Sequence, residues 1–299
     1  MQHTQTQIAT VLGVHKSTIG RELLRNCGRR GYRPRQAHQK AMERRQHKAK
    51  HIVSAEKWLL IESKLRLDWS PEQITGWLNS QNLPAVSHET IHQHVYADKQ
   101  GGGDLYKHLR CQKKCRKRYG RYDCRGEIPA RRGIEARPGI VDLREHLGDW
   151  EMGTLIGISH QGVLVTVSER KSRFTLLRQV SHKSADRAAQ AVIELLGWVS
   201  HMATITADNG KEFAAHRTIA HKLDAEFYFA HPYAAWERGT NENTNGLIRQ
   251  YIPKDRNLTA VTAEKEVMIM DRLNLRPRKC LNFRTPFEEF FGQSIALTT

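Results

Sequence analysis

The stretch DWEMGTLIGISHQGVLVTVSERKSRFTLLRQV, residues 149–180, decides the fold of the C-terminal half. It holds three short runs rich in β-branched and aromatic residues, at 150–158, 162–167 and 174–180, with turn residues between them. Runs of this length and composition, separated by turn signals, are typical of β-strands. The stretch therefore predicts three consecutive antiparallel strands.

Helical and strand patterns alternate after these three strands. Residues 184–199 carry small and apolar side chains at helical spacing, and 204–207 form a short run typical of a buried strand. A helix is predicted from about Lys211, a strand at 226–230 and a long helix from near Thr240. The resulting order βββαβαβα is that of an α/β RNase H-like fold.

Positive charge is concentrated in front of this half. The chain has 299 residues and a net charge of +17. Residues 1–140 contain 28 Lys and Arg against 12 Asp and Glu, whereas residues 141–299 contain 20 against 19. A surface that only keeps a protein soluble mixes the two signs, but here they are segregated. Because Lys and Arg bind nucleic-acid phosphates and release counterions, the front half is predicted to bind a polyanion.

Apolar segments and cysteines exclude further classes of protein. No run approaches about 18 apolar residues, and the first residues lack the apolar core of a signal peptide, so we expect a cytoplasmic protein. Five cysteines, an odd number, argue against a disulfide framework. Cys111, Cys115 and Cys124 lie near His108, but their spacing matches no familiar zinc motif and their neighbours are mostly basic, which disfavours a zinc site.

Residues 5–23 have the pattern of two short helices around a glycine turn. Their apolar residues are spaced so that the two helices can pack on each other, which predicts a helix-turn-helix. Lys16, Ser17, Thr18 and Arg21 are expected to face DNA from the second helix. Ser17 lies near the start of that helix, where its hydroxyl can cap the helix or bind a phosphate.

Residues 69–96 repeat this arrangement. Ser70 and the proline after it form a strong helix start, and a second helix begins near Ser87, His88 and Thr90. Any helical hairpin of a small bundle has the same pattern. Two such segments within the basic half nevertheless favour DNA binding, here through Ser87, His88 and Thr90.

These patterns divide a multidomain chain into a helical front and an α/β core. Residues 1–50 are expected to form the first helix-turn-helix with a basic extension, and 51–100 the second. Residues 101–140 are expected to be a basic linker along the DNA backbone, and 141–299 the RNase H-like core with C-terminal helices. A disordered hinge is an equally good interpretation of the linker, since such arms often order on binding.

Two acids in the second half are placed for chemistry. Asp208 directly follows the strand at 204–207, at the edge where open α/β sheets form their sites. Glu242 lies 34 positions further on, at the polar start of the last predicted helix. With a third acid on the first strand, they would bind two divalent cations, and Mg²⁺ prefers such oxygen ligands. Asp-Asn-Gly is also an ordinary turn, so these residues alone are a weak signal.

Longer strings around these acids are more specific, namely TADNGKEF (206–213), WERGTNENTNGL (236–247), DRLN (271–274) and RPRKCL (276–281). Together they resemble the insertion sequence 30 family of bacterial transposases, and the resemblance covers nearly the whole chain. It implies a helix-turn-helix front and a DDE integrase core, with Mg²⁺ or Mn²⁺ as cofactor. By the same resemblance, Asp208 is the second and Glu242 the third catalytic acid and metal ligand.

The resemblance also implies the partners of the protein. These are double-stranded DNA, as terminal inverted repeats and as target, and further copies of the chain in a homodimer or larger assembly that joins two ends. A nucleoid-associated location in a bacterium follows. Family members usually have a further helix ahead of the first helix-turn-helix, whereas this chain begins almost at that motif. We therefore expect a truncated or decayed copy.

The first acid is where the chain departs from the family. Members usually carry Trp-Glu-x-Asp-Thr on the first strand, and here Gly153 stands at the aspartate position. Side chains alternate along a strand, so Asp149 and Glu151 share the face of position 153, about 13 Å and about 6.6 Å from it. Both are candidates to replace the missing acid. We expect an impaired enzyme, with a catalytically inactive DNA-binding remnant or competitor as the alternative.

Three further basic residues, Lys211, Arg238 and Arg249, are candidates for DNA contact. A solvated helix face explains Lys211 and Arg249 equally well, and a salt bridge to Glu237 or another acid explains Arg238. Trp236 is expected to pack within the loop before the last helix. A nuclease without sequence preference is a third hypothesis, but it leaves the two helix-turn-helix segments unexplained.

Overall fold

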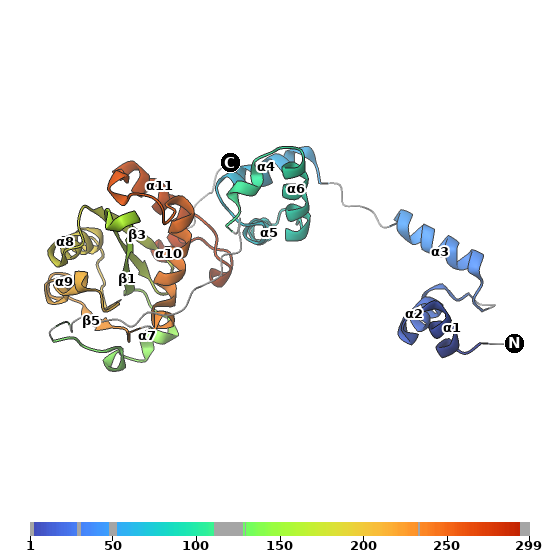
Figure 1. Ribbon diagram of the computed structural model, residues 1–299, viewed down its shortest axis with the longest axis horizontal. Helices are drawn as coiled ribbons and strands as arrows, with labels where there is room; N and C mark the ends of the chain where they lie inside the picture. Colours follow the sequence, from blue (N-terminus) through green and yellow to red (C-terminus); the bar gives the residue numbers. More distant parts are fainter. Residues whose placement is uncertain are drawn as a thin grey trace. The chain divides into compact units, whose positions relative to one another are not determined.

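The computed structural model describes residues 3–28, 31–47, 53–110, 128, 130–232 and 234–293 (Figure 1). The chain divides into two compact units, with the boundary between Ser54 and Ala55. The cysteines at 111, 115 and 124 lie outside the described residues, as do residues 111–127 and 129 of the predicted linker. No helix in the described ranges is long and apolar enough to cross a membrane.

The first unit contains three helices, α1 (Gln5–Leu12), α2 (Lys16–Asn26) and α3 (Pro34–His47). Thr4 caps α1, and Gly13 ends it in a left-handed conformation with φ 66° that a residue with a Cβ rarely adopts. Ala9 and Ile19 are the buried contacts between α1 and α2. The two helices and the glycine turn therefore lie where the sequence predicted them.

The second unit begins with α4 (Ala55–Arg66), α5 (Pro71–Ser80) and α6 (His88–Gln100). Ser70 caps α5, and Ser87 caps α6 by accepting from the backbone N–H of Thr90. These three helices belong to the same compact unit as the sheet, although 51–100 was predicted as a domain of its own. A polar contact joins them to the C-terminal region, because Arg276 Nε donates to Gln73 Oε1 across 2.7 Å.

A five-stranded mixed sheet follows, with strand order β3-β2-β1-β4-β5. β1 pairs antiparallel with β2 and parallel with β4, and β4 pairs parallel with β5. The strands are β1 (Asp149–Ile156), β2 (Val163–Glu169), β3 (Thr175–Val180), β4 (Thr204–Ala207) and β5 (Glu226–Phe229). This is the RNase H-like arrangement, and the predicted fold class is confirmed.

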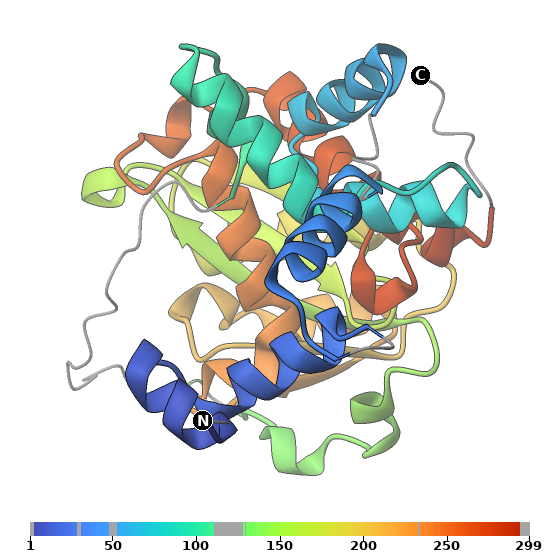
Figure 2. The same cartoon turned by 90° about the vertical axis from the view of Figure 1, so that its right-hand side faces the viewer.

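Helices cover both faces of the sheet, as Figures 1 and 2 show. One hydrophobic cluster packs the sheet against α8 and α9, and a second packs its other face against α10 and α11. α8 contributes Ala188, Val192 and Leu196 to the first cluster at helical spacing. The helices are α7 (Ile140–Leu143), α8 (Ala185–Leu196), α9 (His216–Leu223), α10 (Gly239–Tyr251), α11 (Ala263–Asn274) and α12 (Pro286–Phe291).

Alternation along β1 decides which residues lie under α10. Trp150 and Met152 belong to the cluster on the α8 side, whereas Leu155 belongs to the cluster on the α10 side. Because successive side chains point to opposite faces, Glu151 and position 153 lie on the α10 face with Leu155. The face that carries the expected first acid is therefore the face covered by the helix of Glu242.

Candidate active site

The pairing of β1 with β4 indicates which residue of β1 lies next to Asp208, at the C-terminal end of β4. The parallel register pairs Asp149 with Thr204 and Glu151 with Thr206. Continuing that register by two residues brings Gly153 level with Asp208, which directly follows β4. An aspartate at position 153 would therefore stand next to Asp208, as the family motif requires of the first two acids.

Arg238 is the cation that binds Asp208. It lies in the 3-10 turn η5 (Ala235–Arg238), and its Nη2 donates to Asp208 Oδ2 across 3.0 Å. Its Nη1 donates to the Met152 carbonyl across 2.8 Å. The guanidinium therefore bridges β1 and the C-terminal end of β4. The sequence left two interpretations of Arg238 open, a DNA contact or a salt bridge. The structure contains a salt bridge, and its partner is Asp208.

The space beside Gly153 is filled by side chains from the start of α10. A Cβ at position 153 would lie 2.4 Å from Asn241 Oδ1 and 3.1 Å from Arg238 Nη1. Asn241 is fully buried, and its Nδ2 donates to Thr166 Oγ1 across 3.1 Å. Its Oδ1 accepts from Asn245 Nδ2 across 2.9 Å. An aspartate could enter only if the Asn241 side chain turned away.

Glu151, a candidate replacement for the first acid, is fully buried. Its Oε1 accepts from Arg170 Nη1 across 2.7 Å, and its Oε2 accepts from the backbone N–H of Asn241 across 2.9 Å. Both carboxylate oxygens are thus engaged by the protein. Glu151 therefore holds the start of α10 against β1, and its carboxylate has a structural role.

Asp149, the other candidate, lies at the opposite end of β1. It is fully buried, and its Oδ1 accepts from Thr204 Oγ1 across 2.6 Å. Its Oδ2 lies 2.8 Å from His146 Nε2. Four residues separate it from position 153, so it is about 13 Å away along the strand. The structure does not bring Asp149 together with Asp208.

Glu242 lies in the first turn of α10 and is exposed. Within the part of the chain that the structure describes, no hydrogen bond or ion pair engages its carboxylate. A negative side chain near a helix N-terminus interacts favourably with the helix dipole. Glu242 is therefore free to meet a cation or a substrate.

The donor set does not complete a two-metal site. Such a site needs several carboxylates that surround two cations about 3.5–4 Å apart. Position 153 supplies none, and Arg238 neutralises one oxygen of Asp208. Among the described residues no group of three His, Cys, Asp or Glu side chains is arranged to hold a metal. The residues of this chain thus do not fit the metal centre that the family resemblance implies.

The loop before α10 places Trp236 outside the protein. Trp236 is 77 % exposed, so the prediction that it packs within the loop was wrong. In the tight turn of η5, Arg238 is directed inward to Asp208, and a residue two positions away points to a different side. A large exposed aromatic ring therefore lies on the turn that also carries Arg238.

His231 closes the same loop through Glu237. Its Nδ1 lies 2.8 Å from Glu237 Oε1, and Glu135 contacts its other ring nitrogen. The hydrogen bond to Glu237 raises the pKa of His231 above its ordinary value, against the opposite effect of desolvation. A raised pKa means that the contact is strongest while His231 is protonated, and that it weakens as pH rises through that pKa.

Replacing Glu237 by glutamine is expected to lower the pKa of His231 toward the ordinary histidine value. An NMR titration of the His231 ring protons measures it directly. Glu135→Gln serves as the matched control and should lower this pKa less, because the hydrogen bond to Glu237 is the largest cause. An unchanged titration midpoint in Glu237→Gln would contradict the assignment.

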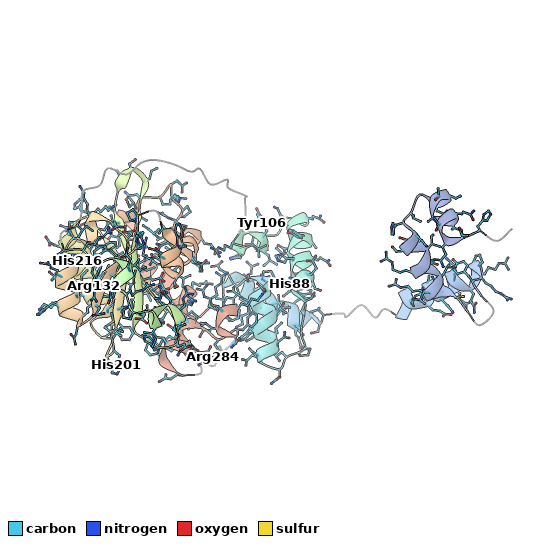
Figure 3. The ribbon with its side chains drawn as sticks, turned by 90° about the horizontal axis from the view of Figure 1, so that it is seen from below. His88, Tyr106, Arg132, His201, His216 and Arg284 are labelled. Atoms are coloured by element: carbon cyan, nitrogen blue, oxygen red, sulfur yellow. The ribbon has the colours of Figure 1, made fainter. Side chains whose placement is uncertain are left out.

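The other predicted DNA-contact residues are spread over the described chain. Lys16, Ser17, Thr18 and Arg21 are exposed on α2, and Arg21 Nε donates to the Ser17 carbonyl. Ser87 and His88 are exposed at the start of α6, and Thr90 is half-buried; Figure 3 labels His88 there. Lys211 is exposed, but Arg249 Nη2 donates to the Ile156 carbonyl across 2.9 Å and so supports the core. Their DNA contacts stay predictions.

Asn241, a residue of the site, was missed from the sequence, as was the buried acid Glu212. Asn241 lies within the family-specific string before Glu242, and that string was the signal available for it. Glu212 is buried, accepts from Thr154 Oγ1 across 2.7 Å and pairs with Lys183 Nζ at 3.1 Å. It lies inside the string that contains Asp208, but nothing local distinguishes it from a surface acid.

Comparisons with known proteins give consistent results. No protein-family model matches the chain. The chain is 44% identical over 288 residues to a transposase for insertion sequence element IS4351 from Bacteroides fragilis, covering 95% of this chain and 88% of that protein. It is 36% identical to transposase InsI for IS30C from Escherichia coli K12, covering 97% of this chain and 79% of that protein. A transposase for IS1086 from Cupriavidus metallidurans is 34% identical, with coverages of 94% and 87%.

Among solved structures, the catalytic core domain of BIV integrase is similar to part of the chain. It matches with a TM-score of 0.38 and 17% sequence identity, covering 48% of this chain and 94% of that domain.

Proposed function

Since this chain belongs to the IS30 family of transposases, as its sequence motifs predict, we propose that it binds the terminal inverted repeats of an insertion sequence. We propose further that its core is built for polynucleotidyl transfer, in which a phosphodiester bond is cleaved and the freed 3′-hydroxyl is joined to target DNA. In this chain the transfer chemistry is severely impaired.

One observation supports the proposed impairment: the β1–β4 register, extended by two residues, brings Gly153 level with Asp208. In the proposed roles, Asp208 is the second acid and Glu242 the third, and the first acid is missing. Glu151 and Asp149 are bound by Arg170 and Thr204, which supports leaving both out of the catalytic set. A binding-competent but slow transposase is the result.

The basic front of the chain supplies the proposed DNA-binding surface. Lys16, Ser17, Thr18 and Arg21 are exposed together on α2, which suits a helix placed in the major groove. His88 and its neighbours on α6 form a second proposed contact. Two ends must be joined in one reaction, so we propose that at least two copies of the chain assemble on DNA.

A binding measurement tests the proposed function independently of catalysis. The protein is titrated at one salt concentration with a duplex from the terminal repeat beside its own gene, and with a random duplex of equal length. We expect the repeat to bind about a thousandfold more tightly, the lower end for sequence-specific proteins. Arg21→Gln should reduce that ratio, and Arg217→Gln, which changes an exposed arginine on α9, should leave it unchanged.

Equal affinity for the two duplexes would contradict the proposal. It would favour the nuclease without sequence preference, because such a protein binds DNA through phosphates alone. The comparison must be made at matched salt, since phosphate contacts change affinity steeply with ionic strength.

A further inference from the structure

A cavity of about 250 Å³ lies beside α10, outside the group of acids described above. Three arginines line its wall, Arg144, Arg173 and Arg278. Polar residues from one side of α10 line it as well, namely Thr240, Asn243 and Thr244. Asn243 and Cys280, also in the wall, are exposed, so the cavity opens to solvent at their position. We call it the Arg144 pocket.

Glu242 and the Arg144 pocket lie on different flanks of the same helix. Thr240 and Glu242 are two residues apart, which is about 200° around an α-helix. Asn241, between them in the sequence, packs on the sheet through Thr166. The pocket and Glu242 therefore lie on different sides of α10. The distance between them is comparable with the diameter of a helix, roughly 10 Å.

Arginine side chains leave unpaired donors in the pocket. Arg144, Arg173 and Arg278 each have a buried Nε without a hydrogen-bond partner. Arg173 Nη1 donates to Thr240 Oγ1, and Arg278 Nη2 donates to the Leu273 carbonyl. For Arg144 no side-chain hydrogen bond or ion pair is present anywhere in the described residues. Partly buried guanidinium groups with unpaired N–H donors lose hydrogen bonds to water, so a bound anion would stabilise this arrangement.

No carboxylate of the described residues lines the pocket. The nearest acids, Asp142 and Glu151, are engaged elsewhere, because Arg170 binds both and Arg137 binds Asp142 as well. Burial lowers the pKa of Arg144, and the neighbouring charges of Arg173 and Arg170 lower it further, against the opposite effect of Glu151 and Asp142. Burial also lowers the pKa of Arg278, to about 10. Both guanidinium groups are therefore partly desolvated, and a bound anion would favour their charged forms.

Arg144 ends α7 with φ 56° and ψ 37°, a left-handed conformation that commonly terminates helices. The end of α7 therefore sets where the Arg144 side chain leaves the backbone.

We propose that the Arg144 pocket binds a phosphate group of the DNA on which the core acts. Guanidinium groups bind phosphate oxygens through paired N–H donors, and Thr240 and Asn243 add neutral polar groups at the same wall. Arg110, whose Nη2 donates to Asn243 Oδ1, extends the positive surface toward solvent. This assignment rests on the proposed function, because it identifies a contact to the same DNA.

The test compares the unaltered chain with two variants, Arg144→Gln and Arg217→Gln. Arg217→Gln is the control, because it removes an exposed charge on α9, which packs on the other face of the sheet from α10. Arg144 is the variant of choice because its side chain has no described partner to lose. Affinity for a random-sequence duplex is measured at several salt concentrations. We expect Arg144→Gln to weaken binding about fivefold to tenfold near 0.1 M salt. The slope of log affinity against log salt should fall by about 0.9, the value for one lost phosphate contact.

A second measurement, the second arm of the test, distinguishes the possible results. Inorganic phosphate is added to each protein while its melting temperature is followed, because a ligand that binds the folded state raises it. Stabilisation by phosphate that Arg144→Gln abolishes, without any change in DNA affinity or slope, would overturn the DNA assignment and leave a site for the free anion. Unchanged behaviour in both arms would overturn the pocket altogether. Failure of the unaltered chain to bind any DNA at low salt would instead refute the proposed function.

Discussion

Replacing Gly153 by aspartate is expected to raise cleavage of end-bearing DNA in Mg²⁺ buffer by about a hundredfold or more over the unaltered chain. The expected gain is large because position 153 lies level with Asp208 in the parallel register of β1 and β4. The substitution would supply the carboxylate that the family motif places there. A gel assay on a labelled terminal repeat, run for both proteins side by side, measures it.

The new side chain has to displace its neighbours. Its Cβ would lie 2.4 Å from Asn241 Oδ1, so the Asn241 side chain must rotate away from Asn245. Arg238 Nη1, at 3.1 Å, needs to move only a few tenths of an ångström and can then share its charge between both acids.

Gly153→Asn is the matched control for this prediction. It requires the same displacement of Asn241 but adds no charge, so it should fold like the aspartate variant and cut no better than the unaltered chain. If the unaltered chain already cuts as well as Gly153→Asp, a carboxylate other than one at position 153 completes the site, and the alignment of β1 with the family motif is wrong.

Local patterns were sufficient for the fold. The runs at 150–158, 162–167 and 174–180 became β1, β2 and β3 with small shifts at their ends. Each of these elements is encoded by residues adjacent in sequence, which is why periodicity finds it. The strings that resemble the family likewise singled out Asp208 and Glu242 because they are contiguous, and the catalytic roles of these acids stay predictions.

Contacts between distant residues could not be predicted in this way. Glu151 meets Asn241 across 90 positions, and Arg238 meets Asp208 across 30. Which acid a given arginine pairs with depends on how β1, β4 and α10 pack, and no local signal carries that information. The outward position of Trp236 was missed for the same reason, since aromatic residues are usually buried and only the turn geometry of η5 decides otherwise.

Replacing Glu151 by alanine is expected to lower the free energy of unfolding of the second unit by about 3 kcal/mol or more. Both oxygens of this fully buried carboxylate are bound, by Arg170 and by the backbone N–H of Asn241. Removing one partner of a buried ion pair typically costs about 3–5 kcal/mol. Asp142, the remaining partner of Arg170, is largely exposed and compensates the arginine charge only in part. Urea unfolding, followed by tryptophan fluorescence in metal-free buffer, measures the change.

The matched control for Glu151→Ala is Glu194→Ala. Glu194 pairs with Arg178 at 3.3 Å, but both side chains are nearly half exposed, so this pair should contribute about 1 kcal/mol or less. The comparison also decides between the two roles considered for Glu151. If Glu151 served only to bind a metal, its carboxylate would not stabilise the metal-free protein. Glu151→Ala would then leave the free energy of unfolding unchanged or raise it. A loss several times larger than that of Glu194→Ala would instead establish that Glu151 fastens α10 to β1 and is not available to replace the missing acid.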